Sequence, residues 1–183
     1  MIYLNNGATS WPKPPAVLEA VQACLSGTPA SQFRGGSSIM KKDVEVLCRE
    51  KLGQLLGIRE TERIFFTSGA TESMNTVLGG LDYGEKGSSI LVTQTAVRPD
   101  SRVLIVNHCS NVTGCVQDME MIREFVKRHG LILIVDVSQS AGCIPVDADK
   151  WEADALIFTG HKSLMGIQGT GGFYVRSGIE LKP

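Results

Sequence analysis

The sequence predicts a three-layer α/β/α domain with a mostly parallel central sheet, and three observations support this fold class. Short apolar runs alternate with helical stretches from residue 64 onwards. The run Leu131–Val135 is apolar at every position, which is typical of a strand buried on both faces. The 183-residue chain is 43% hydrophobic and 20% charged, so it can bury a core and is not disordered.

Two helices are predicted before the sheet begins. Apolar residues recur at helical spacing in 16–25, behind a proline-rich stretch, and again in 40–56. The expected buried side of the second helix comprises Val44, Leu47, Leu52, Leu55 and Leu56. Between the two, 27–38 is rich in glycine and serine and is predicted to be a loop. We therefore divide the chain into an N-terminal segment and loop, 1–38, and a single-domain core, 39–183.

The core pattern predicts alternating strands and helices. The predicted strands are 64–67, 90–93, 103–107, 131–136, 155–159 and 172–175, and the predicted helices between them are 70–81 and 117–129. In such sheets, ligands bind at the carboxyl ends of the strands. The polar stretches at those ends are 67–69, 107–111, 136–139 and 159–162.

Composition argues against several classes of protein. A formal net charge of −1 without a Lys/Arg cluster disfavours nucleic acid as a partner. The five cysteines follow no C-x-x-C spacing, so neither a disulfide framework nor a metal site is expected. No apolar run approaches the ~18 residues of a membrane span, and no signal peptide is recognisable. We expect a cytoplasmic protein without membrane contact.

The segment TSGATE, 67–72, combines a strand end, a glycine turn and a helix start. The N–H groups of Gly69, Ala70 and Thr71 would face an anion such as phosphate, which the helix dipole favours. The alternative is a plain strand–turn–helix joint with Ser68 as the N-cap. Taken alone, the segment favours that alternative.

Two charged residues follow predicted strand ends. Asp136 ends the most apolar strand, where a carboxylate needs a cation or several hydrogen bonds. A protonated ring nitrogen satisfies that need, and backbone amides or a metal ion satisfy it equally well. Lys162 follows 26 residues later, enough for one crossover and one strand, which places it at the same edge. A partly desolvated lysine can bond to an aldehyde, although most single lysines are simply solvated.

The motifs together are far more specific than each alone. The stretches are NGATSWPKP (6–14), TSGATE (67–72), SNVTG (110–114), VDVSQSAG (135–142) and TGHKSLMGIQGTGG (159–172), and they are distributed over almost the whole chain. In combination they resemble the class V aminotransferase group of fold-type I pyridoxal-phosphate enzymes. Within that group, the sequence is most similar to cysteine desulfurases and selenocysteine lyases.

The resemblance implies a role for each matching residue. Lys162 would be the catalytic lysine that bonds to the cofactor aldehyde, and Asp136 the partner of the pyridine nitrogen. Gln139 and Asn111 would contact the phenolic oxygen of the ring. The remaining matches are phosphate-binding Ala70, Thr71, Thr159 and His161, and Asn6 near the substrate amino acid. The family also implies a homodimer and a substrate of the cysteine or selenocysteine class.

The chain departs from the family in two places. It lacks the family's C-terminal part, which carries a small domain, a carboxylate-binding arginine and a nucleophilic cysteine. It also lacks an internal segment after strand 90–93, including the histidine that stacks on the ring; neither His108 nor His129 matches that position. The linker 95–101 has only seven residues, whereas a parallel crossover normally needs a dozen or more. Either this linker stretches across the sheet, or strand 90–93 has moved or reversed.

Three functions remain open at this stage. The leading hypothesis is a cysteine desulfurase-like pyridoxal-phosphate protein that releases sulfur or selenium, or performs a reduced chemistry on an amino acid. The alternative is a catalytically incomplete, truncated paralogue or fragment that acts as an interaction protein. A generic nucleotide-binding fold is weaker, because no G-x-G-x-x-G follows the first strand.

Overall fold

Six strands form one sheet at the centre of the molecule, in the order β1-β6-β5-β4-β3-β2. The computed structural model describes residues 2–27, 44–84, 89–92 and 97–182. The strands are β1 Ile64–Thr67, β2 Ser89–Val92, β3 Ser101–Asn107, β4 Ile132–Asp136, β5 Ala155–Thr159 and β6 Gly171–Val175. Strands β2, β3, β4 and β5 are parallel, and β6 runs antiparallel to both β5 and β1. The predicted, mostly parallel sheet is thereby confirmed.

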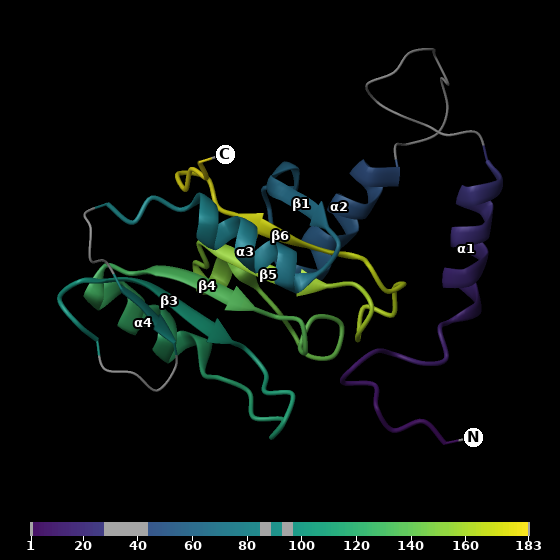
Figure 1. The fold of residues 1–183 in the computed structure, drawn as a ribbon, viewed down its shortest axis with the longest axis horizontal. Coiled ribbons are helices and arrows are strands. Elements are labelled where there is room, and N and C mark those ends of the chain that lie inside the picture. The colour runs from purple at the N-terminus through teal and green to yellow at the C-terminus, as the bar shows by residue number, and fades with distance from the viewer. Residues whose placement is uncertain (1, 28–43, 85–88, 93–96, 183) are drawn as a thin grey trace, which may run out of the picture.

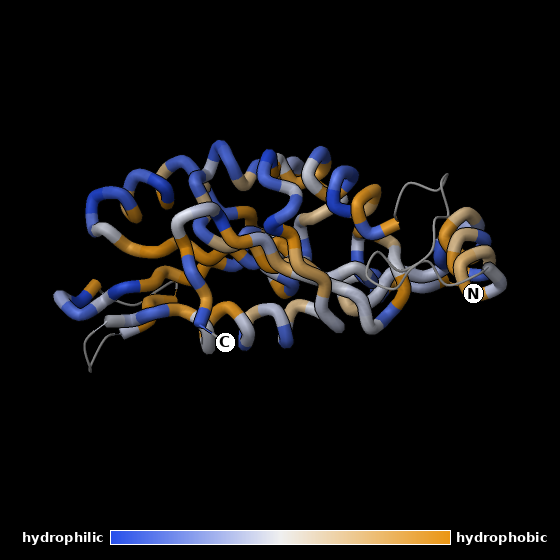
Figure 2. Tube along the Cα trace, turned by 90° about the horizontal axis from the view of Figure 1, so that it is seen from above, coloured by the Kyte–Doolittle hydropathy of each residue, from blue (hydrophilic) through white to orange (hydrophobic). Residues whose placement is uncertain are grey.

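Helices cover both faces of this sheet and give the predicted three layers (Figure 1, Figure 2). The helices are α1 Pro15–Ser26, α2 Val44–Leu56, α3 Ala70–Gly80, α4 Met119–His129 and α5 Ala148–Trp151, with a 3-10 turn η1 at Thr61–Arg63. One core cluster joins Leu56 of α2, Val126 of α4 and Trp151 of α5 to the sheet. A second core cluster, on the opposite face of the sheet, contains Val77 of α3.

Strand β4 shows why the sheet needs two helical layers. Its successive side chains alternate between the two faces. Leu133 and Val135 belong to the cluster under α2, α4 and α5, whereas Ile134 belongs to the cluster under α3. All three are fully buried. An uninterrupted apolar run is therefore the sequence signature of this central strand.

Helix α1 lies apart from the rest of the chain (Figure 1). None of its residues is buried, although its apolar spacing correctly predicted a helix. The predicted buried side of the next helix is partly wrong. Leu56 is fully buried and Leu52 packs against the core, but Val44, Leu47 and Leu55 are exposed. The predicted domain boundary at 38/39 and most of the predicted loop 27–38 lie outside the described residues.

Strand β2 keeps its parallel orientation despite the short connection to β3. Ile90 pairs with Val103 and Val92 with Ile105 in parallel orientation, so the alternative of a reversed strand is wrong. The connection passes through 93–96, which lie outside the described residues, and then through Val97, which packs against the core. The other alternative, a linker 95–101 that stretches across the sheet, falls partly outside the described residues.

The sheet face that carries α3 is only partly covered. Helix α3 packs against β5 and β6, at one side of that face. Further along it, Ile105 and Ile132 are half-buried, while Ile90 and Val92 of β2 are exposed. An apolar surface therefore extends over β2 on this side of the sheet.

Short polar signals set the ends of helices α4 and α5. Asp118 caps α4 by accepting the N–H groups of Glu120 and Met121, and Gly130 ends it in the left-handed conformation. Asp147 caps α5 through the N–H of Lys150. The sequence analysis missed α5, because four residues are too few to show helical periodicity.

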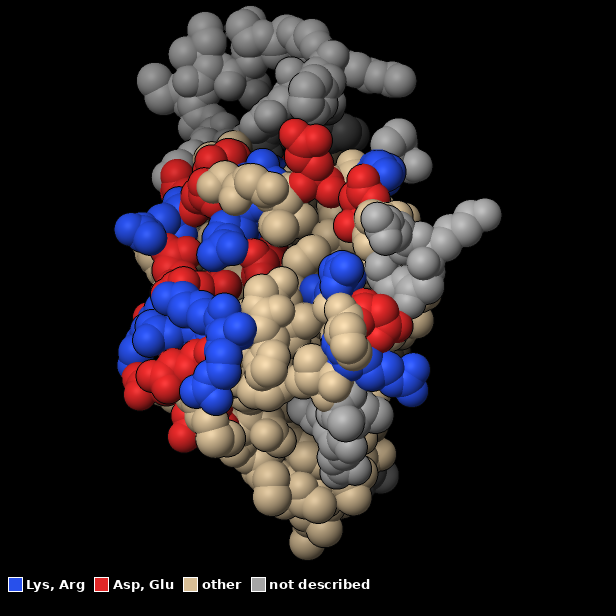
Figure 3. Space-filling view, turned by 90° about the vertical axis from the view of Figure 1, so that its left-hand side faces the viewer, with Lys and Arg blue, Asp and Glu red and all other residues tan. Residues whose placement is uncertain are grey.

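Charges of both signs lie side by side on the face drawn in Figure 3. Ion pairs of the described residues include Lys127 with Glu152 at 2.5 Å and Lys150 with Glu120 at 2.9 Å. These exposed pairs stabilise the fold only weakly. Within the described residues, no helix has the length and apolar character needed to cross a membrane.

His108 makes the stability of the fold depend on pH. Its side chain is buried, with Nδ1 2.8 Å from Ser140 Oγ and the ring 4.6 Å from that of Trp151. Burial lowers the pKa of His108 below its ordinary 6.5. The unfolded chain therefore takes up this proton before the folded protein does, so stability is fully present above about pH 6.5 and is lost as the pH falls through the folded pKa.

We expect His108→Phe to reduce this loss, since phenylalanine keeps the ring and cannot be protonated. Urea unfolding at about pH 7.5 and about pH 5.5 measures the difference in free energy. The same change at exposed His129, as His129→Phe, is the control for the substitution itself. An unchanged pH dependence in His108→Phe would contradict the assignment.

Candidate functional site

The strand register aligns the predicted site segments along one edge of the sheet. Thr67 of β1 and Thr159 of β5 both pair with Gly171 of β6, so the three stand in one row. On β4, Asp136 pairs with Ile157 of β5, two residues before Thr159. The stretches that follow β1, β4 and β5 therefore leave the sheet at the same edge, as the sequence predicted from the topology of parallel strands.

The N-terminus of α3 lies at this edge, and it is not capped by Ser68 as the alternative of a plain strand–turn–helix joint predicted. The N-cap is Gly69, which has no side chain, and not Ser68. Glu72 reaches back instead, and its carboxylate accepts the backbone N–H of Ser68 at 2.7 Å and its hydroxyl at 2.5 Å. These hydrogen bonds lower the pKa of Glu72. The N–H groups of Ala70 and Thr71, in the first turn, have no intrahelical acceptor and remain for an anion.

Close backbone contact fixes α3 against the ends of β5 and β6. A Cβ on Gly171 would lie 2.6 Å from Gly69 Cα and 2.8 Å from the carbonyl oxygen of Phe158. A Cβ on Gly69 would lie 3.9 Å from Thr159 Oγ1. The structure thus brings the start of α3 next to Thr159, although the two are separated by about 90 residues in the sequence.

His161 and Lys162 lie in a tight loop after β5. The loop is closed by hydrogen bonds from Gly166 N–H to the Gly160 carbonyl at 2.7 Å and from Met165 N–H to the Lys162 carbonyl at 2.9 Å. The side chains of His161 and Lys162 are half-buried. Burial, and next the charges of Lys162 and Lys13, lower the pKa of His161, which favours a neutral ring.

Two buried polar atoms of the site have no hydrogen-bond partner among the described residues. They are His161 Nδ1 and Ser138 Oγ. Ser138 is only 5% exposed, and a buried polar atom without a partner is costly. The sequence analysis missed Ser138, and its position between Asp136 and Gln139 is the signal that could have found it.

Asp136 and Gln139 already have one partner each. Asp136 Oδ1 accepts the Ser138 N–H at 2.8 Å, and within the described chain Oδ2 accepts no hydrogen bond. Gln139 Nε2 donates to the Gly7 carbonyl at 3.2 Å, which leaves its second N–H for another acceptor. Each side chain thus keeps one polar group available at the sheet edge.

Two predicted site residues, Asn6 and Asn111, make no described contact with the other predicted site residues. Asn6 is exposed, and its Oδ1 accepts the N–H of Trp11 at 3.1 Å. Asn111 is also exposed, in a turn closed by a hydrogen bond from Gly114 N–H to the Ser110 carbonyl. Their predicted contacts with substrate and ring remain predictions.

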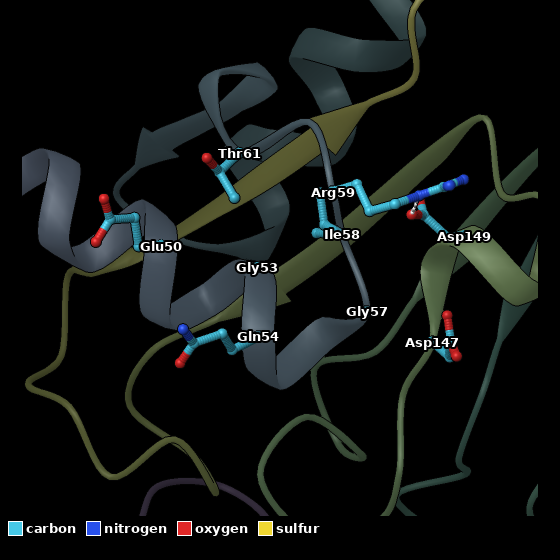
Figure 4. A pocket seen from close by; sticks show the side chains of 9 residues that line it. All are labelled: Glu50, Gly53, Gln54, Gly57, Ile58, Arg59, Thr61, Asp147 and Asp149. Carbon is cyan, nitrogen blue, oxygen red and sulfur yellow. Dashed lines mark hydrogen bonds and ion pairs between the residues drawn. The ribbon is translucent and has the colours of Figure 1, made fainter.

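A cavity of about 520 Å³ lies elsewhere, beside the C-terminal half of α2 (Figure 4). It is lined by Glu50, Gly53, Gln54, Gly57, Ile58, Arg59, Thr61, Asp147 and Asp149. Arg59 and Asp149 form an ion pair at its side. None of the predicted site residues lines it. In the described part of the chain, no group of His, Cys, Asp and Glu side chains could hold a metal ion.

Comparison with known families gives a match over nearly the whole chain. The profile of the aminotransferase class-V family matches residues 2–98 and 93–182. The two matched ranges overlap at 93–98, where the internal segment of the family is predicted to be missing.

Similar proteins of known name are cysteine desulfurases. Cysteine desulfurase IscS of Enterobacter sp. (strain 638) is 31% identical over 219 aligned residues, which cover 96% of this chain and 53% of the relative. That aligned stretch is longer than the 183-residue chain, so the relative has residues within it that this chain lacks. The chain spans about half the length of the curated relatives it matches.

Solved structures of cysteine desulfurases share the fold. Cysteine desulfurase CsdA from Escherichia coli is 26% identical with a TM-score of 0.77, over 94% of this chain and 53% of that one. A cysteine desulfurase from Thermococcus onnurineus NA1 is 25% identical with a TM-score of 0.76, over 96% and 54% of the two chains.

Proposed function

Because the chain belongs to the aminotransferase class-V family, whose cofactor is pyridoxal phosphate, we propose that it binds this cofactor and acts as a cysteine desulfurase-like protein. The observation that carries the proposal is the sheet edge, where a lysine, a carboxylate and the N-terminus of α3 lie together. The two buried polar atoms without partners, His161 Nδ1 and Ser138 Oγ, fit a polar ligand at the same place.

Each end of the cofactor has matching groups in this chain. Ala70 and Thr71 would hold the phosphate through the N-terminus of α3, together with the Thr159 hydroxyl and a neutral His161. Lys162 would bond to the aldehyde.

The ring would be oriented by the stretch that follows β4. Asp136 Oδ2 would accept a hydrogen bond from the protonated ring nitrogen. The second N–H of Gln139 would donate a hydrogen bond to the ring oxygen. Asn111 would add a second polar contact to that oxygen.

Bound pyridoxal phosphate supplies an electron sink for a carbanion on an amino acid. We propose an amino acid of the cysteine or selenocysteine class as substrate, with Asn6 near it, and a cytoplasmic location. Sulfur abstraction also requires a thiolate. Among the five cysteines, Cys143 is the one in contact with the lysine loop, with Sγ 2.9 Å from Ser163 Oγ. None matches the family's nucleophile, so cofactor binding is the property to measure first, and sulfur transfer the second.

Reduction with borohydride in the presence of pyridoxal phosphate should label Lys162 alone. Lys162 follows β5 at the sheet edge that also carries Asp136 and the N-terminus of α3, whereas surface lysines such as Lys127 and Lys150 pair with carboxylates elsewhere. Peptide mapping by mass spectrometry measures the label at each lysine, with Lys162→Ala as the control that should take up none. Label spread over Lys13, Lys41, Lys127 and Lys182 would reject a specific site and favour the interaction-protein alternative.

We also propose that the chain forms a homodimer. The apolar surface over β2, with Ile90 and Val92 exposed, supports association because such surfaces are seldom left in water. Sedimentation at tens of micromolar should show a species of twice the 19.7 kDa chain mass or larger. The variant Ile90→Lys should shift the protein towards the monomer, and a parent that sediments as a clean monomer would contradict the proposal.

A further inference from the structure

Residues 5–13, here called the N-terminal strap, lie against the loop that carries Lys162. Figure 1 shows this segment in purple next to the loop before β6. Tyr3, just before the strap, holds it in a compact turn: Tyr3 Oη donates hydrogen bonds to the carbonyls of Asn5 and Thr9, at 3.0 Å and 2.9 Å. Tyr3 also packs edge-on against the Trp11 ring, with centroids 5.7 Å apart.

One atom of the core receives most of the hydrogen bonds from the strap. The carbonyl oxygen of His161 accepts the Ser10 N–H at 2.9 Å, Lys13 Nζ at 3.0 Å, and the hydroxyls of Thr9 and Ser10 at 3.1 Å each. Lys13 Nζ also donates to Ser10 Oγ at 2.7 Å. A carbonyl oxygen has two lone pairs, so four donors around it form an unusually dense cluster.

Within the described residues, the strap makes its hydrogen bonds to the core at two places only. These are the His161 carbonyl and the side chain of Gln139, which donates to Gly7. Helix α1, which follows the strap, has no buried residue. The attachment of the strap therefore depends on the two loops that surround the proposed cofactor site.

We propose that Lys13 is a positioning residue for Lys162, a role that rests on the proposed function of that lysine. The carbonyl of His161 belongs to the peptide unit that ends at the nitrogen of Lys162. Holding this carbonyl fixes the plane of that peptide unit and hence the direction in which the Lys162 side chain leaves the backbone. A charged donor holds it more strongly than a neutral one.

The first measurement follows the strap in the full chain without cofactor. Lys13→Met should raise amide hydrogen exchange about tenfold in the peptide that covers the strap, the effect of losing one charge-assisted hydrogen bond. Lys13→Arg keeps a charged donor and should restore most of the protection. Lys51→Met changes an exposed lysine of α2 and is the matched control. Unchanged exchange in Lys13→Met would show that Lys13 does not hold the strap.

The second measurement is the rate at which Lys162 is labelled by borohydride reduction, with pyridoxal phosphate and with pyridoxal. If Lys13 positions Lys162, Lys13→Met slows labelling about tenfold with both reagents, and Lys13→Arg rescues it. A loss confined to pyridoxal phosphate would mean that the ammonium merely attracts the phosphate, which overturns the positioning role. Equal labelling in parent and Lys13→Met overturns it as well.

The two measurements separate this inference from the proposed function. If the parent chain takes up no label at Lys162, the proposed function fails and the positioning role fails with it. The exchange measurement then still decides whether Lys13 holds the strap on the core. If the parent is labelled but Lys13→Met behaves like the parent, the proposed function stands and only the role of Lys13 is wrong.

Discussion

Asp136→Asn is expected to weaken pyridoxal phosphate binding about ten- to hundredfold while leaving the stability of the cofactor-free protein nearly unchanged. The structure explains why the two effects separate. Oδ1 of Asp136 accepts the Ser138 N–H at 2.8 Å, and an asparagine oxygen can keep this hydrogen bond. In place of Oδ2, asparagine presents an NH₂ group, which cannot accept a hydrogen bond from the protonated ring nitrogen.

Equilibrium titration with cofactor and urea unfolding without it measure the two quantities. Asp147→Asn is a suitable control, because Asp147 caps α5 away from the site and its substitution should not change cofactor affinity. Lower stability of Asp136→Asn with unaltered cofactor affinity would show that Asp136 only accepts hydrogen bonds from the backbone. Unchanged stability with weaker binding supports the role proposed for Oδ2.

Gly171→Ala is expected to destabilise the fold by about 1–3 kcal/mol and to weaken cofactor binding as well. The added Cβ would lie 2.6 Å from Gly69 Cα and 2.8 Å from the Phe158 carbonyl oxygen, closer than real Cβ atoms come to such neighbours. Both neighbours are backbone atoms, so they cannot rotate away as the end of a side chain can. The start of α3 must move, and with it the N–H groups proposed to bind phosphate.

Gly79→Ala provides a matched control within the same layer. Gly79 lies in α3, and a Cβ there meets no atom within 4 Å. The change should stabilise the protein by up to about 1 kcal/mol, since alanine favours a helix over glycine. Urea unfolding of both variants compares the same substitution with opposite expected signs. If Gly171→Ala were as stable as Gly79→Ala, the close approach of β6 to α3 would be disproved.

Local pattern was sufficient to predict the six strands and helices α3 and α4, but not α5. The uninterrupted run at 131–136 indicated a central strand, and β4 is indeed covered on both faces. Apolar spacing also predicted α3 and α4, because a helix that packs on a sheet needs one apolar side. The same rule misplaced Val44, Leu47 and Leu55, which have the right spacing but are exposed.

The chemical groups at the strand ends follow from the amino-acid sequence alone, since Asp136, Thr159 and Lys162 end or follow apolar runs whose strand character is a local property. The support of these groups depends on tertiary contacts. The contact of Gly171 with Gly69 and the hydrogen bond from Lys13 to the His161 carbonyl join residues that are about 100 and 148 positions apart. Such contacts arise from sheet register and chain crossing, which local spacing does not encode.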